Sequence, residues 1–117
     1  MTNESTERLE RFLDKFRKAG TVFAEAFARH ELVEANGKAV VAALMKEAEA
    51  NGVSSVAAQE RDARASPEYQ EHLASVYKTR MELEIARVEL EALRMKFSGA
   101  QTIKANERAE IRAYSTT

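Results

Sequence analysis

The chain contains no cysteine and no tryptophan, and it has only one proline and four glycines in 117 residues. Without cysteine there is no disulfide, no thiolate zinc site and no cysteine nucleophile. The scarcity of proline and glycine leaves little material for turns or long loops. The longest apolar run, 39–45, is far shorter than the roughly 20 residues of a membrane span. The first residues also lack a basic stretch followed by an apolar run, which is the pattern of a secretion signal. We therefore expect a cytoplasmic protein that has no membrane partner.

The charges are numerous but nearly balanced. Eighteen basic and nineteen acidic residues give a net charge of -1. Such a balance does not imply a general electrostatic attraction to nucleic acid or to an anionic membrane. The dominant residue types are alanine, glutamate, lysine, arginine and leucine, a composition typical of long helices and coiled coils.

The sequence predicts an all-α protein, a single domain over 1–117 with three or four helices and no strands. The Asn36-Gly37 and Asn51-Gly52 pairs are residue types that end helices. Ser66, Pro67 and Glu68 stand in the order expected at a helix start. The predicted helices are about 5–35, 38–50, 55–65 and 67–113. The polar segment 55–65 is either a separate helix or continuous with the last helix across a kink at Pro67.

The last helix is the most informative element. After Pro67 there is no further proline, and Gly99 is the only glycine up to Thr117. At ~1.5 Å per residue, such a helix is on the order of 70 Å long. We expect the earlier segments to form an N-terminal helical hairpin that packs on this long, coiled-coil-like helix.

Helical periodicity places two apolar stripes on roughly opposite sides of this last helix. The first stripe comprises Val76, Leu83, Leu90 and Phe97, flanked by Ala86, Leu93, Ala100 and Ile111. The second stripe comprises Tyr77, Met81, Ile85, Val88, Ala92, Met95, Gly99 and Ile103. A helix on the outside of a bundle needs one apolar face, so a helix with two such faces is expected to have two neighbours.

The chain's earlier helices can cover one stripe along its length, but they are too short to cover both. We therefore expect a second copy of the protein on the second stripe, giving a homo-oligomer, dimer or higher. The residues predicted to form this self-association or partner interface are Tyr77, Met81, Ile85, Val88 and Met95. The other interpretation is a monomeric bundle in which the last helix is central and both stripes are internal.

Arginines recur at heptad spacing on the last helix, at Arg80, Arg87 and Arg94, with Arg108 two heptads later. A phosphate backbone lying along the helix would fit such a ladder, which makes nucleic-acid binding the alternative function. However, Glu84 and Glu91 stand four residues after the first two arginines, within reach of ion pairs. Interhelical ion pairs, and arginine stems that cover an apolar stripe, are the favoured interpretation.

No catalytic or cofactor signature is present. There is no glycine-rich phosphate loop, no nucleophile elbow and no strand that would carry either. Glu68 and His72 are spaced to share a metal ion, but two ligands do not make a site. We expect His30 and His72 to be surface or partly packed side chains, no cofactor and no metal, and a protein that is not an enzyme.

Two segments, Glu60–Tyr69 and Ala86–Phe97, resemble small uncharacterised proteins of tailed phages and prophages, which are often encoded near single-strand annealing recombinases. The resemblance covers roughly residues 57–112. It implies a phage accessory protein of the host cytoplasm, in recombination or in countering host defence, and it carries over no functional residue. Together with the two stripes it predicts a non-enzymatic interaction or adaptor protein that also binds a second protein.

Overall fold

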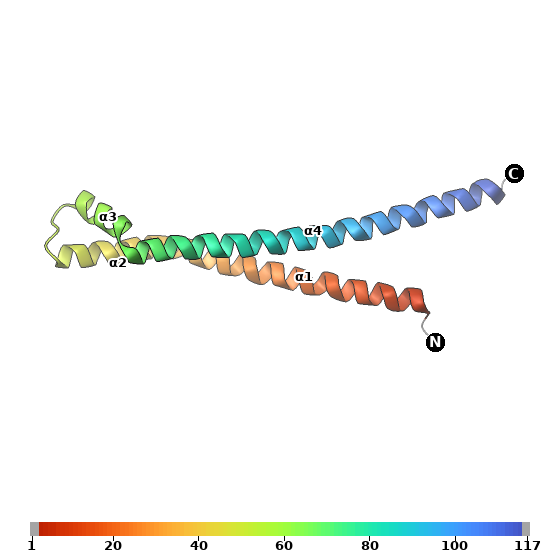
Figure 1. The fold of residues 1–117 in the computed structure, drawn as a ribbon, viewed down its shortest axis with the longest axis horizontal. Coiled ribbons are helices and arrows are strands. Elements are labelled where there is room, and N and C mark those ends of the chain that lie inside the picture. Colours follow the sequence, from red (N-terminus) through yellow and green to blue (C-terminus); the bar gives the residue numbers. More distant parts are fainter. Residues whose placement is uncertain (1–2, 116–117) are drawn as a thin grey trace. The chain divides into compact units, whose positions relative to one another are not determined.

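The computed structural model describes residues 3–115, and these residues form four α-helices and no strand (Figure 1). The helices are α1 (Glu4–Ala35), α2 (Gly37–Ala50), α3 (Val56–Ala65) and α4 (Pro67–Ser115). The all-α class and the long C-terminal helix packed against the N-terminal helices confirm the sequence prediction. Contacts divide the chain into two compact units, which are described separately below: unit 1 is residues 1–23 and 86–117, and unit 2 is residues 24–85.

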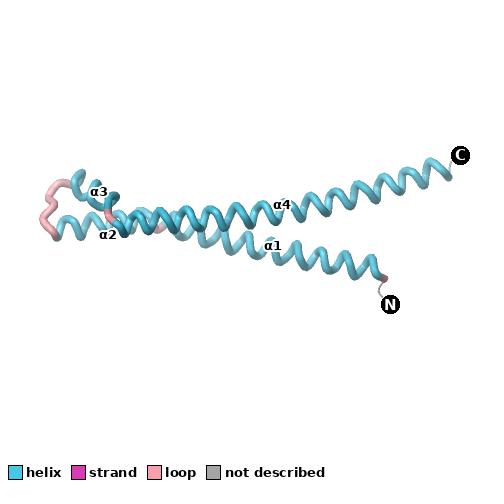
Figure 2. The backbone as a smooth tube through the Cα atoms, viewed as in Figure 1, coloured by secondary structure: helices cyan, strands magenta, loops and turns pink. Residues whose placement is uncertain are grey.

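Unit 2 contains the turn that reverses the chain, between α2 and α3 (Figure 2). Gly52 has a φ of 98°, the only positive φ among the described residues. Its N–H donates to the Glu49 carbonyl at 3.1 Å, and the N–H of Val53 donates to the Ala48 carbonyl at 3.0 Å. These two bonds make a Schellman C-cap, which needs glycine because other residues are strained at this φ. The predicted helix end at Asn51-Gly52 is therefore confirmed.

Ser66 separates α3 from α4 and serves both helices. Its backbone is extended, with φ -71° and ψ 151°. Its hydroxyl donates to the Ala63 carbonyl at 2.7 Å and accepts from the Tyr69 N–H at 3.2 Å. The predicted N-cap of the long helix is confirmed, and the segment 55–65 is a separate helix, capped by the Ser55 hydroxyl, which accepts from the Ala58 N–H at 3.1 Å.

The Asn36-Gly37 pair marks the boundary between α1 and α2, as predicted, but without the positive φ that its residue types tolerate. Asn36 has φ -75° and ψ -11°, close to helical values, and Gly37 does not have a positive φ. Helical hydrogen bonds continue on both sides, from the Asn36 N–H to the Leu32 carbonyl and from the Val40 N–H to the Asn36 carbonyl. The heptad spacing of apolar residues also continues from α1 into α2, so packing overrides the local preference for a C-cap.

In unit 2 the end of α1 and the start of α2 run antiparallel to α4. His30 bonds Thr79, Arg29 pairs with Glu82, and a Cβ built on Gly37 would lie 3.0 Å from Nε2 of His72. As residue numbers rise on α1 and α2, the partner numbers on α4 fall, which is the antiparallel order. α3 packs against α2. The buried residues of unit 2 are Ala26, His30, Gln59, Ala63 and Leu83.

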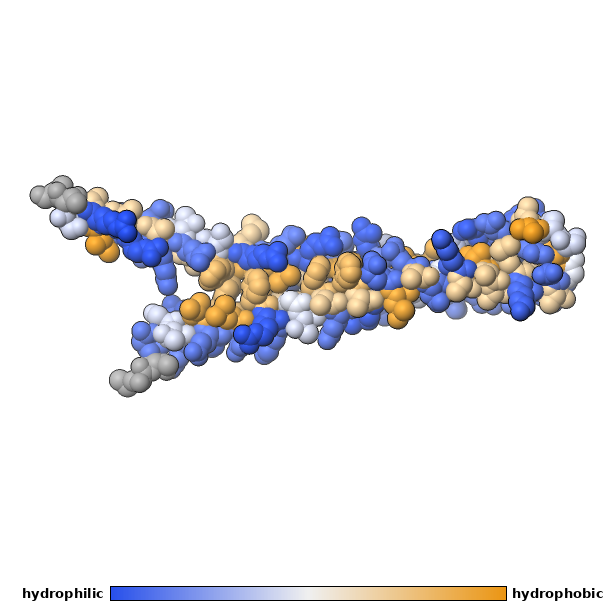
Figure 3. All heavy atoms as spheres, turned by 180° about the vertical axis from the view of Figure 1, so that it is seen from behind, coloured by the Kyte–Doolittle hydropathy of each residue, from blue (hydrophilic) through white to orange (hydrophobic). Residues whose placement is uncertain are grey.

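Unit 1 joins the first part of α1 to the second part of α4, again antiparallel. The rings of Phe12 and Phe97 stack with centroids 5.7 Å apart, and the Arg87 guanidinium lies over the Phe23 ring at 5.7 Å. Ala86 and Leu90 are buried here, and Figure 3 shows apolar residues gathered where the two helices meet. Residues 98–115 of α4 are all exposed, and in Figure 1 the two helices of this unit diverge toward their ends.

Candidate interaction surface on α4

The first stripe of α4 is the side that the chain's own helices cover. Leu83, Ala86 and Leu90 are 4%, 6% and 9% exposed. Val76 and Leu93 are half-buried. Cover decreases toward the C-terminus: Phe97 still stacks on Phe12 but is 36% exposed, and Ala100 and Ile111 are exposed. The prediction that the N-terminal helices cover one stripe is therefore confirmed over residues 76–93.

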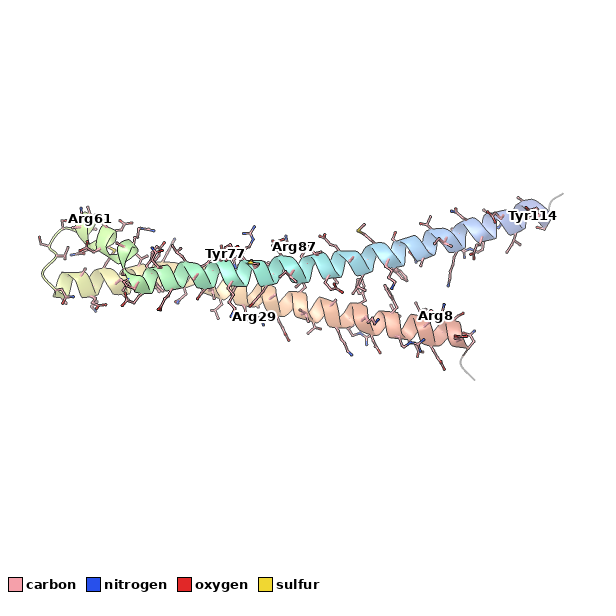
Figure 4. The ribbon with its side chains drawn as sticks, in the orientation of Figure 1. Arg8, Arg29, Arg61, Tyr77, Arg87 and Tyr114 are labelled. Atoms are coloured by element: carbon pink, nitrogen blue, oxygen red, sulfur yellow. The ribbon has the colours of Figure 1, made fainter. Side chains whose placement is uncertain are left out.

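The second stripe is left exposed. Its predicted interface residues are exposed by 69% at Tyr77, 47% at Met81, 64% at Ile85, 64% at Val88 and 73% at Met95. The first three belong to unit 2, where Figure 4 labels Tyr77 on α4, and the last two belong to unit 1.

The smaller residues of the stripe continue the same pattern. Ala92, Gly99 and Ile103 are exposed as well. The helix is unbroken through Gly99. The described residues therefore neither bury this side of α4 nor fold the helix back onto it.

Charged side chains line the edges of the second stripe, and several have partners within the chain. Glu82 pairs with Arg29 of α1 at 3.8 Å, and Glu84 pairs with Arg80 at 3.4 Å. Glu89 and Lys96, on the same edge as Glu82, are exposed and form no ion pair with any residue among 3–115. The section of the stripe in unit 1 thus has an acidic and a basic group one heptad apart, neither of them neutralised locally.

The arginine ladder is partly occupied by the chain itself. Arg80 is held by Glu84 on the same helix, and Arg87 lies over the Phe23 ring. The guanidinium over a ring is a cation–π contact, and it covers the apolar seam as predicted for arginines at this position. The ion pair Arg29–Glu82, which joins α1 to α4, lies outside the ladder. Arg94 and Arg108 are exposed and pair with no carboxylate of residues 3–115.

His30 differs from its prediction, because it is buried, with 4% of its surface exposed. The Thr79 hydroxyl lies 2.9 Å from Nδ1 of His30 and 3.1 Å from the Val76 carbonyl, within hydrogen-bond distance of both. The other ring nitrogen lies 3.4 Å from the Glu34 carboxylate. The pair forms a polar layer inside the seam of unit 2. The sequence could have indicated this layer, because His30 and Thr79 each occupy a position of the apolar heptad pattern of their helix.

His72 is half-buried, as predicted, and it fills the space that Gly37 leaves. A Cβ at residue 37 would lie 3.0 Å from Nε2 of His72, and the His72 ring also lies beside Tyr69 with centroids 6.0 Å apart. Within residues 3–115, no three of the histidine, aspartate and glutamate side chains are grouped closely enough to hold a metal ion. In the same part of the chain, no helix is both long and apolar enough to cross a membrane.

A hollow of about 380 Å³ in unit 2 lies beside α2 and the α3–α4 junction. Val41 and Met45 give it an apolar wall. Its charged lining residues are Glu34, Lys38 and Arg64, and the Arg64 guanidinium is engaged by the Glu60 carboxylate at 3.2 Å and by the Tyr69 hydroxyl at 3.1 Å. A guanidinium held in this way is a structural support rather than a reacting group.

Comparison with known proteins does not identify the chain. No protein-family model matches it, and neither the curated proteins nor the solved structures include one that is similar to it.

Proposed function

We propose that the protein is a non-enzymatic interaction protein, which associates with copies of itself through the second stripe of α4 and presents its helices to a second protein. The observation that carries the proposal is the contrast between the two sides of one helix. Both have apolar residues at coiled-coil spacing, but the chain's own helices cover only the first stripe.

The free energy of burial gives the physical reason for self-association. Burying an apolar side chain of this size fully contributes roughly 1.5–3 kcal/mol relative to leaving it in water. Ile85, Val88 and Met95 are each more than half exposed, so a helix packed on them would gain a substantial part of this energy. Contiguous apolar surfaces of this kind mark interaction sites more often than free surface.

A second copy supplies a matching surface, because a twofold interface uses the same patch on both subunits. Self-association through α4 would leave α1, α2 and α3 free to contact a different protein. The resemblance of residues 57–112 to phage proteins supports a phage accessory protein as the setting, with a recombination or host-defence factor as that partner in the host cytoplasm.

Sedimentation equilibrium of the wild type and of an Ile85→Glu/Val88→Glu variant tests the proposal. The wild type should sediment as a dimer or higher oligomer of the 13.1 kDa chain, and the variant as a monomer, because four or more charges would enter the apolar contact. The matched control is Val22→Glu/Leu32→Glu, two exposed apolar residues of α1, one in each unit. This control should keep the wild-type mass.

Two results would contradict the proposal. A wild type that remains monomeric up to millimolar concentration has no self-association to explain. A variant with glutamate at residues 85 and 88 that keeps the wild-type mass would show that the copies meet elsewhere. Circular dichroism of each variant establishes that its helix content is unchanged.

A further inference from the structure

We propose that the second copy lies antiparallel to the first along α4 in unit 1, with Glu89 of each copy beside Lys96 of the other. The inference rests on the proposed self-association and adds its direction and register. It follows from charges that have no partner within residues 3–115, from the heptad spacing of the stripe, and from one glycine that packing among these residues does not require.

Glu89 and Lys96 lie on one edge of the second stripe, and α4 gives them no charged neighbours. Side chains three and four residues apart are neighbours on a helix. For Glu89 and Lys96 these neighbours are all uncharged, namely Ile85, Ala86, Ala92, Leu93, Gly99 and Ala100. By contrast, Glu82 on the same edge already pairs with Arg29. The two charges are therefore free to pair with another chain.

The stripe follows the alternating four- and three-residue spacing of a coiled-coil seam through Ile85, Val88, Ala92, Met95 and Gly99. The seam residues of a coiled coil alternate between two heptad positions, a and d. In an antiparallel pair, each a position of one helix faces a d position of the other. One register sets Ala92 opposite Met95 and Gly99 opposite Val88, which matches small residues with large ones. The same register brings Glu89 and Lys96 together twice, once on each side of the twofold axis.

Neighbouring registers are less favourable because of charge. A shift of one heptad in one direction brings the two copies of Glu89 together and sets Lys96 beside Glu82, which Arg29 already pairs. A shift in the other direction brings the two copies of Lys96 together. A parallel pair would instead set Glu91 beside Lys96, and Glu84 beside Glu89, each of them twice, so that two attractions are offset by two repulsions. The antiparallel register with Glu89 beside Lys96 is the arrangement in which these edge charges are complementary.

Gly99 is an independent observation on the same surface. A Cβ built on it would meet no atom within 4 Å, so nothing in the chain's own packing calls for glycine there. Glycine inside a helix is nonetheless unfavourable, and it is expected where another backbone or side chain approaches closely. In the proposed register that side chain is Val88 of the second copy.

Charge reversal tests the pairing by measuring the dissociation constant of the dimer. E89K or K96E alone should weaken the dimer by about tenfold, because two attractive pairs become two repulsive ones, and the double variant E89K/K96E should restore it to within about twofold. E91K/K96E should not restore it, since that combination repairs only a parallel dimer. Matched reversals of exposed charges on α2, K46E and E49K, should leave the constant unchanged.

A distance measurement checks the direction separately. The chain has no cysteine, so A105C provides a single site for a spin label. In the proposed dimer the two labelled positions are about 23 residues apart along the helix axis, or roughly 35 Å. In a parallel, in-register dimer they would lie within about 20 Å of each other, because equivalent positions share one layer.

The outcomes separate this inference from the proposed function. A monomeric wild type overturns both. A dimer that E91K/K96E restores, or that gives the short label distance, overturns the antiparallel direction and leaves self-association in place. A dimer that no reversal at residues 89 and 96 alters overturns the pairing in the same way.

Discussion

The two apolar sides of α4 are nearly alike in sequence but opposite in burial. Leu83 of the first stripe is 4% exposed, whereas Ile85, two residues later on the second stripe, is 64% exposed. Both lie at coiled-coil spacing on one unbroken helix. The difference teaches that helical periodicity shows which sides of a helix are apolar, but not which of these sides the chain's own helices cover.

On the covered first stripe of α4, a small residue lies near a large one. The antiparallel order seen at His30–Thr79 sets the small Ala26 near the large Leu83, and these two residues are 2% and 4% exposed. Close packing of this kind makes a covered position sensitive to a change of even one methylene. The second stripe has no such constraint until another chain lies on it.

The largest expected effect compares Leu83→Ala with Ile85→Ala. Leu83→Ala should lower the free energy of unfolding by about 2–5 kcal/mol, because it opens a cavity in a buried site. Ile85→Ala should change it by less than about 0.5 kcal/mol when the protein is dilute enough to be monomeric. Urea denaturation at low and high protein concentration measures both. Equal losses at low concentration would show that Ile85 is already covered within one chain.

The buried polar layer gives the next largest effect. Thr79→Val should cost about 1–3 kcal/mol, because it leaves Nδ1 of His30 buried without its hydrogen-bond partner. His30→Leu should cost less, because the Thr79 hydroxyl keeps its bond to the Val76 carbonyl. The double variant His30→Leu/Thr79→Val should be closer to wild type than Thr79→Val alone. Urea denaturation of all three gives the order, and a His30→Leu variant that loses more free energy of unfolding than Thr79→Val would contradict it.

The smallest expected effect comes from replacing two glycines, Gly20 and Gly99, which have similar surroundings within a single copy of the chain. A Cβ on Gly20 or on Gly99 would meet no atom within 4 Å, so Gly20→Ala and Gly99→Ala should each stabilise the monomer by up to about 1 kcal/mol. Only Gly99→Ala should also weaken self-association, because its methyl group enters the contact with the second copy. Thermal unfolding and sedimentation measure the two properties. Stronger association of the Gly99 variant would exclude a close approach there.

Helix existence and most helix ends were predictable because they depend on local chemistry. Ser66 before Pro67 and Gly52 after Asn51 cap helices by bonds to atoms a few residues away. The first helix ends at Ala35, as predicted, but Asn36 stays close to helical because the apolar seam continues through it. Local preference was outweighed there by packing between segments far apart in sequence.

The sequence predicted which residues form the candidate surface, but it predicted only some of the contacts made by the residues around it. Helical spacing alone placed Tyr77, Met81 and Met95 on one side of α4. The burial of His30 was not predicted, because it depends on Thr79 lying opposite, 49 residues away. Arg87 over Phe23 likewise depends on the antiparallel register. To predict which residue lies opposite another on a neighbouring helix, one needs the register of the two helices. The periodicity of one helix does not give that register.

The two units also differ in how the chain must come together to form them. Unit 2 is one continuous segment, whereas unit 1 pairs residues as distant as Phe12 and Phe97. Closing a short loop costs less entropy than closing a long one, so we expect folding to nucleate at the Gly52 turn and then to zip α1 and α4 together toward their ends. Pulsed hydrogen exchange during refolding would then protect amides of unit 2 before those of unit 1, and the reverse order would exclude this route.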